Sequence, residues 1–360
     1  MVSRRTFLAA AIAGTATAFL TRGAHARSAA VPRTSVGAAN SLELSVQPTR
    51  VFKRTSDQNR LRVEYWLFNL VLRSPSQDKP VLRSLAVEGL SNGQVVRSTT
   101  WTAQALAQFN LIGAAPLPAK AGGWIVAAFN VGDDVPVALA IDSVHCVLEL
   151  DGGHGRQRLE ATIPLETYVQ KTHLVFPFRG NGMITQGGAW NDGHRNRSGM
   201  FAIDAIGLTD LYAAMNEEGD ASRSAAGWGR TIIAPEAGMV VVARGDRPDQ
   251  PVLGVSDPAY FVPEFPNGGD PGNNLVIDHG NGEFSAIDHF QHGSLRVAVG
   301  DRVVQGQALG LLGSSGDSSS PHVHHQLQDG PDWTMANALP HAYANGPLGQ
   351  HDRGTMFSAT

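Results

Sequence analysis

Apolar and polar residues alternate along much of the first half of the chain. Between positions 61 and 67 every second residue is apolar, namely Leu61, Val63, Tyr65 and Leu67. A period of two sends successive side chains to opposite faces of a β-strand. We therefore expect a strand whose Leu61 to Leu67 row faces the core, while the residues between them, Trp66 included, face away.

Further segments of the first half have β-prone composition. Residues 95–101 form one such segment, 135–150 can supply a pair of strands or one long strand, and 159–163 supply another. Only residues 103–109 have a locally helical pattern. Short strands at this spacing predict a β-sandwich of immunoglobulin-like size over residues 42–168. His145, His154 and His173 are isolated, so we assign this part as an accessory domain.

Short apolar segments separated by glycine-rich turns continue through the second half. The expected strands are 231–235, 239–242, 274–278, 283–287, 295–299 and 308–313. Residues 244–272 break this pattern with many prolines and glycines, and loops of that length usually line a site or are disordered. The chain is therefore predicted to be all-β, with a second domain at 169–345 and a polar tail at 346–360.

The first 26 residues are typical of an export signal. Ser3-Arg4-Arg5-Thr6-Phe7-Leu8 precedes an apolar run of about a dozen residues, and Ala24-His25-Ala26 has the small-x-small pattern of a cleavage site. The pair Arg4-Arg5 resembles the twin-arginine type, whose export machinery would be a partner. An uncleaved membrane anchor or a chance basic start is the alternative. The run is shorter than the ~20 residues that a membrane-spanning helix needs, and no other long apolar segment exists, so no span is expected in the mature protein.

Composition narrows the possible partners and the redox chemistry. Residues 27–41 are small and polar, which is typical of a flexible linker. Removing residues 1–26 takes away three arginines and no acid, so 28 basic and 32 acidic residues become 25 and 32, a net charge of about −7. This surface argues against nucleic acid as a partner. The single cysteine, Cys146, cannot form an internal disulfide, and its apolar neighbours predict a buried thiol.

Three histidines lie within four positions of the segment SSSPHVHHQLQDG, residues 318–330. In a strand, His322 and His324 point to one face and His325 to the other. A single cysteine excludes a thiolate zinc site, whereas a catalytic zinc site takes three protein ligands from nitrogen and oxygen donors. Asp204 lies among apolar residues, where a buried charge needs a cation or hydrogen bonds. The chain can therefore form a metal site whose ligands are histidine and aspartate side chains.

Three segments of the second half resemble, in order, the zinc metallopeptidases of the LytM/lysostaphin type. They are NDGHRNRSGMFAIDAIG, then IIAPEAGMVVVARGD, then GNNLVIDHGNGEFSAIDHFQHGSLRVAVGDRVVQGQALGLLGSSGDSSSPHVHHQLQDGPD. The resemblance covers residues 175–340 approximately and excludes the first half. It implies an antiparallel β-rich peptidase with a groove, a single Zn²⁺ ion, and a substrate in bacterial peptidoglycan.

The resemblance also implies residue roles. His194, Asp204 and His324 match the zinc ligands, and His289 and His322 match two active-site histidines that do not bind the metal. The expected mechanism is attack by zinc-activated water, with His322 as base and His289 donating to the intermediate, although the sequence does not separate these two roles. Nine residues separate His194 from Asp204, whereas the commonest family pattern is His-x-x-x-Asp.

The sequence therefore predicts an exported zinc endopeptidase acting on peptidoglycan peptides in the periplasm, the cell wall or outside the cell. One alternative is a catalytically inactive relative that binds cell wall or regulates another hydrolase. The other is a metal-dependent hydrolase with a different substrate, for which the first domain would supply specificity.

Overall fold

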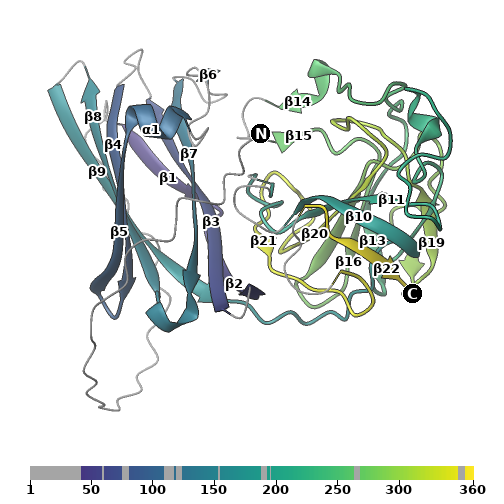
Figure 1. The fold of residues 1–360 in the computed structure, drawn as a ribbon, viewed down its shortest axis with the longest axis horizontal. Coiled ribbons are helices and arrows are strands. Elements are labelled where there is room, and N and C mark those ends of the chain that lie inside the picture. The colour runs from purple at the N-terminus through teal and green to yellow at the C-terminus, as the bar shows by residue number, and fades with distance from the viewer. Residues whose placement is uncertain are drawn as a thin grey trace. The chain divides into compact units, whose positions relative to one another are not determined.

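The computed structural model describes most of the chain after the predicted linker. Described residues are 42–58, 61–74, 81–108, 117–118, 124–152, 155–187, 193–194, 196–262, 268–347 and 353–360. The predicted export signal and linker lie outside them, so both stay predictions. Within the described ranges, α1 (Ala103–Gln108) is the only α-helix and nearly all other regular structure is strand, which confirms the all-β prediction (Figure 1). No helix among these residues is long and apolar enough to span a membrane.

One nine-stranded sheet is built from the first half of the chain. Its strands are β1 (Glu43–Gln47), β2 (Val51–Gln58), β3 (Leu61–Ser74), β4 (Val81–Ser91), β5 (Gln94–Thr102), β6 (Leu117–Pro118), β7 (Trp124–Pro136), β8 (Ser143–Gly152) and β9 (Gly155–Thr167). The order is β5-β4-β8-β9-β2-β3-β7-β6, and β1 pairs with β3. All pairs are antiparallel except β2 with β9. The segment 135–150 is thus divided between two strands.

Side chains from distant strands of this sheet share one buried core. Phe68 and Leu70 of β3 belong to the same buried cluster as Val144 and Leu148 of β8. In the sheet order, β9 and β2 separate these two strands, so the halves of the sheet pack face to face. The specific immunoglobulin-like arrangement stays a prediction. Cys146 is fully buried in this core, and burial raises the pKa of its thiol.

The prediction for β3 is half right, because Tyr65 and Leu67 are buried as expected but the opposite face is buried as well. Trp66, which was expected to face away from the core, is 2% exposed and lies in the cluster with Phe68 and Leu70. Tyr65 and Leu67 belong to a second buried cluster. Both faces of β3 are therefore buried, and a strand buried on both faces has no polar row to mark its outer side.

A second nine-stranded sheet comes from the second half. Its strands are β10 (Gly180–Gly187), β11 (Ile203–Gly207), β13 (Gly238–Arg244), β16 (Asn274–Asp278), β17 (Phe284–Asp288), β18 (Arg302–Val303), β20 (Val323–Gln328), β21 (Ala338–Leu339) and β22 (Met356–Ala359). The order is β18-β13-β16-β17-β20-β11-β10-β22, with β21 on β20. Small separate pairs are β12 (Thr231–Ile233) with β19 (Ala308–Leu311), and β14 (Phe261–Val262) with β15 (Gly268–Gly269).

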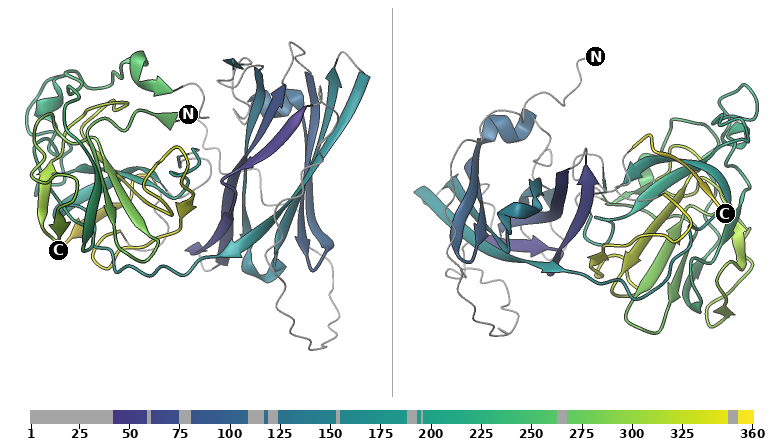
Figure 2. Two further views of the ribbon diagram at one scale, coloured as in Figure 1. Left: turned by 180° about the vertical axis from the view of Figure 1, so that it is seen from behind. Right: turned by 60° about the horizontal axis from the view of Figure 1, so that its bottom comes forward.

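Two expectations for the second half need correction. Residues 295–299 form no strand, because they make only single backbone bonds, such as Arg296 N–H to Leu309 O, and then turn at Asp301. The expected polar tail contains β22, which pairs with β10 and buries Phe357 and Ala359. In Figures 1 and 2 this yellow strand lies beside the teal β10. The division of the chain at residues 168 and 345 stays a prediction.

The turn that leads into β17 is tied to the segment before β10 through one carboxylate. Glu283 is fully buried, and its two oxygens accept backbone N–H bonds from Lys171 and Thr172, both at 2.8 Å. The Tyr168 hydroxyl donates a third bond. Burial alone would raise the pKa of Glu283, but these bonds hold it below its usual value. The ionised form is therefore part of the folded structure.

We predict that Glu283→Gln lowers the free energy of unfolding at pH 7 by about 2–4 kcal/mol, because the amide –NH₂ would face backbone donors. A lowered pKa contributes stability that is fully present above the unfolded value of about 4.3 and is lost as the pH falls through the folded value. That acid-dependent part should disappear in the variant. Urea unfolding at several pH values measures both effects, and exposed Glu218→Gln is the control. Equal stabilities of Glu283→Gln and wild type would contradict the assignment.

Candidate metal centre

Strand pairing places three polar residues in one row on the second sheet. Asp204 of β11 is directly opposite His324 of β20, and His324 is directly opposite Asp288 of β17. Residues directly opposite one another lie on the same face of a sheet. The row Asp204, His324 and Asp288 therefore follows from the register of three strands that are far apart in sequence.

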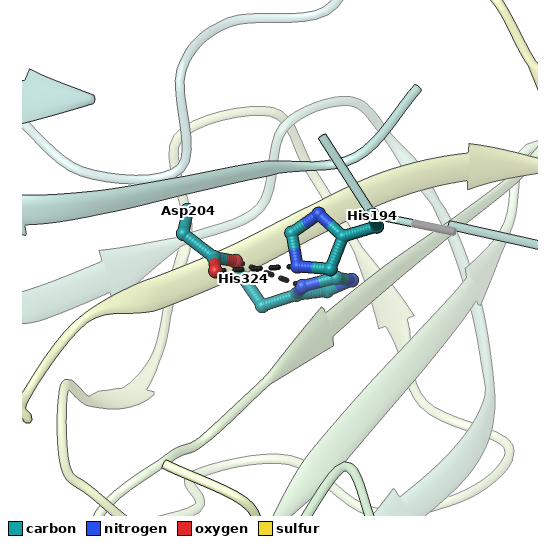
Figure 3. A group of neighbouring side chains, drawn as sticks. All are labelled: His194, Asp204 and His324. Atoms are coloured by element: carbon teal, nitrogen blue, oxygen red, sulfur yellow. Dashed lines mark hydrogen bonds and ion pairs between the residues drawn. The ribbon is translucent and has the colours of Figure 1, made fainter. Parts of the chain in front are cut away.

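The carboxylate of Asp204 contacts a different imidazole with each oxygen. Oδ1 lies 2.9 Å from Nδ1 of His324, and Oδ2 lies 3.2 Å from Nε2 of His194. Figure 3 shows both rings turned toward this carboxylate. Asp204 and His324 are buried, and His194 is half-buried. The predicted ligands His194, Asp204 and His324 thus come together.

His194 reaches the carboxylate from a segment outside the strands. The chain from His194 to β11 makes a turn in which Asn196 Oδ1 accepts the Gly199 N–H and Gly199 O accepts the Ala202 N–H. This turn accommodates the nine residues that separate His194 from Asp204. Nδ1 of His194 is buried without a hydrogen-bond partner among the described residues, and Nε2 is the nitrogen that meets Asp204.

The charges of the three groups suit a cation. Burial would raise the pKa of Asp204, but the rings of His194 and His322 hold it well below its usual range, so the carboxylate is ionised. Burial lowers the pKa of His194, which favours the neutral imidazole that a metal ligand must be. Burial also lowers the pKa of His324, but its bond to Asp204 outweighs this effect and raises the value to about 9.

This donor set fits zinc. One ligand atom from each of His194, Asp204 and His324 lies within 4.8 Å of the others. Two imidazole nitrogens and one carboxylate oxygen match the three protein ligands of a catalytic zinc site, which leaves a fourth position for water. The ring of His324 would have to exchange the proton between Nδ1 and Asp204 for the ion, as ligand binding to a metal generally requires.

The two predicted catalytic histidines lie beside this group. The ring centroids of His289 and His322 are 4.5 Å apart, and Nε2 of His322 is 3.6 Å from Oδ2 of Asp204. Nδ1 of His289 donates to Ser315 O at 2.8 Å, and Nδ1 of His322 donates to Ser320 O at 2.7 Å. A backbone carbonyl can only accept, so both rings carry a proton on Nδ1. Their Nε2 atoms are the ones left for chemistry.

All five predicted site residues line one cavity of about 500 Å³. The long loop 244–272 contributes Ser256, Gly269, Asp270 and Pro271 to its wall, which confirms that this loop lines a site. Sequence reasoning missed two further groups in the cavity. Asp288 has a buried Oδ1 without a partner, and burial raises its pKa to about 7. Only the strand register could have found it, whereas Gln326 continues the period-two row of His322 and His324.

The remaining histidines of the described ranges do not line the cavity. His325 faces away from it, as expected, and its nitrogens bond Tyr343 Oη and Ser285 Oγ at 2.6 and 3.2 Å. His341 is buried and bonds the same Tyr343 hydroxyl. His292 is exposed.

Comparison with known proteins agrees with the predicted class for part of the chain. Residues 220–334 match the model of Peptidase family M23. The match includes His289, His322 and His324 and begins after His194 and Asp204. No curated protein matches the chain.

Several solved structures show a distant likeness. The catalytic domain of lysostaphin from Staphylococcus simulans is 19% identical over 44% of this chain and 88% of its own, with a TM-score of 0.26. A zinc-containing peptidase from Vibrio cholerae is 14% identical over 81% of this chain and 86% of its own, with a TM-score of 0.29. Csd3 from Helicobacter pylori is 12% identical over 91% of this chain and 76% of its own, with a TM-score of 0.30. At these TM-scores the likenesses carry no further argument.

We predict that Asp204→Asn and His324→Ala abolish stoichiometric zinc binding, because each removes one of three donors. His289→Ala and His322→Ala should still bind one zinc ion per chain. Metal analysis of dialysed protein gives the stoichiometries, and exposed His292→Ala is the matched control for the histidine variants. Loss of zinc from His322→Ala would show that the division into ligands and catalysts is wrong.

Proposed function

We propose that the protein is an exported zinc metalloendopeptidase that hydrolyses peptide bonds in bacterial peptidoglycan. The observation that carries the proposal is the convergence of His194, Asp204 and His324, with the Nε2 atoms of His289 and His322 beside them in one cavity. The match of residues 220–334 to Peptidase family M23 supports the reaction class.

Zinc bound to the three ligands would lower the pKa of a water molecule to about 7 and polarise the substrate carbonyl. The protein must then accept the proton of the water and return it to the leaving amine. Nε2 of His322 is suited to this task, because Nδ1 is committed to Ser320 O. The Asp204 carboxylate, 3.6 Å from Nε2, would stabilise the positive ring that forms.

His289 is better suited to accepting than to donating. Nδ1 already donates to Ser315 O, so a donating Nε2 would require a doubly protonated ring. Burial, together with the neighbouring rings of His322 and His324, holds the pKa of His289 well below its usual value. We therefore assign proton transfer to His322, and assign to His289 the orientation of the attacking water through an acceptor nitrogen.

The substrate class rests on the peptidase family and on the predicted export signal. An exported peptidase of this family would meet peptidoglycan in the periplasm, in the cell wall or outside the cell. A cavity of about 500 Å³ is in the range of ligand-binding clefts.

We expect the mature protein to release dye from labelled peptidoglycan, and a chelator should stop the release until zinc is added back. His322→Ala should reduce the rate by about 10²–10⁴-fold, the usual contribution of a general base, while zinc stays bound. His292→Ala should keep the wild-type rate.

The outcomes separate the proposal from its alternatives. Bound zinc without dye release would favour a hydrolase with a different substrate. Absence of zinc binding would favour a catalytically inactive protein that binds cell wall or regulates another hydrolase. Retention of both catalytic histidines and all three ligand types favours the enzyme.

The export prediction has its own test. Arg4→Lys combined with Arg5→Lys keeps the charge but removes the arginine pair that the twin-arginine machinery would recognise. We expect the double variant to accumulate in the cytoplasm with an uncleaved signal. Fractionation and immunoblotting measure this, and normal export of the variant would argue for another route.

A further inference from the structure

A row of buried amides continues from the site along β20. Gln326 and Gln328 follow His324 at intervals of two, and they are 3% and 0% exposed. A buried amide destabilises the fold unless its polar atoms are hydrogen-bonded. Neither glutamine is among the predicted ligands or catalysts. Which groups their amides bond therefore indicates what role they have.

The two amides form a chain of bonds with one direction. Nε2 of Gln328 donates to Gly330 O at 2.7 Å, and this carbonyl can only accept. Oε1 of Gln328 therefore faces Gln326, whose Nε2 donates to it. Oε1 of Gln326 is then left for His324, and it lies 2.9 Å from Nε2 of that ring. Because an amide oxygen only accepts, Nε2 of His324 carries a proton.

This bond decides which nitrogen of His324 is available to a metal. When the proton between Nδ1 and Asp204 gives way to the metal ion, Nε2 stays protonated and the lone pair is on Nδ1. Nδ1 is the atom 2.9 Å from Oδ1 of Asp204. His289 and His322 have the opposite arrangement, with Nδ1 bonded to backbone carbonyls. In the cavity, the nitrogen available for bonding is thus Nδ1 in the proposed ligand His324 and Nε2 in the proposed catalysts His289 and His322.

We propose that Gln326, oriented by Gln328 and the Gly330 carbonyl, is the positioning residue that holds His324 with Nδ1 toward the metal. The proposal rests on the proposed function only in taking His324 as a zinc ligand. Partners of metal-bound histidines fix the ring orientation, and their loss weakens metal binding by about 10–100-fold. Gln326 acts through His324 and is not itself a ligand.

The test measures zinc affinity of the purified full-length chain by competition with a chromophoric chelator. Gln326→Leu replaces the amide with a shorter apolar side chain that has no acceptor, and it should bind zinc about 10–100-fold more weakly. Gln326→Glu restores an acceptor at the same place and should recover most of the affinity. A purely structural role would not be rescued by a buried carboxylate, so this pair separates positioning from packing.

Two more variants complete the design. Gln328→Leu removes the group that orients the Gln326 amide and should also weaken zinc binding. If Gln326→Leu does not fold, the zinc affinity of Gln328→Leu tests the proposal instead. Gln170→Leu removes a glutamine that likewise donates to backbone carbonyls, Thr172 O and Ala342 O, but does not touch His324. This control should bind zinc as wild type does.

The two proposals fail in different ways. If wild type binds no zinc, the proposed function fails. If wild type binds zinc and both Gln326→Leu and Gln328→Leu match its affinity, the positioning role is wrong. Affinity that is lost in Gln326→Leu and not recovered in Gln326→Glu also overturns it.

Discussion

The buried carboxylate of Asp204 is the constraint on which the site depends. An ionised group at this depth destabilises the fold unless opposite charge or hydrogen-bond donors meet both oxygens. Here His324 and His194 meet one oxygen each. The pairing of β11 with β20 supplies the first contact, and a turn outside the sheet supplies the second. The Asp204 carboxylate therefore holds together His324 from the neighbouring strand and His194 from a loop.

Backbone carbonyls orient the histidines of the site. Ser315 O and Ser320 O accept from Nδ1 of the two catalytic candidates, and Gly330 O acts on His324 through two glutamine amides. A carbonyl cannot donate, so each of these bonds assigns a proton to one ring nitrogen. Chemically identical side chains thereby acquire different exposed nitrogens, as the proposed division between ligand and catalysts requires.

Elsewhere, the local sequence pattern predicted whether a segment is helix or strand better than it predicted which faces of a strand are buried. The strands at 274–278 and the helix at 103–109 lie within a residue of their predicted bounds. Trp66 lies on the face opposite Tyr65 and Leu67, as predicted, but that face is buried too, and alternation alone does not show which of two apolar faces is exposed. β22 was missed because four residues make a weak periodic signal, and only the edge of β10 gives them a partner.

The sequence alone determined the all-β class, the division of His322 and His324 from His325, and the five residues that meet in the cavity. Periodicity and family resemblance are local or ordered along the chain, so both are visible without a structure. Only the tertiary structure showed the turn through which His194 meets Asp204, placed Asp288 in the same row, and revealed the amide chain beyond His324. These features depend on strand register and on which carbonyl a side chain meets, and neither is encoded in the spacing of residues along one segment.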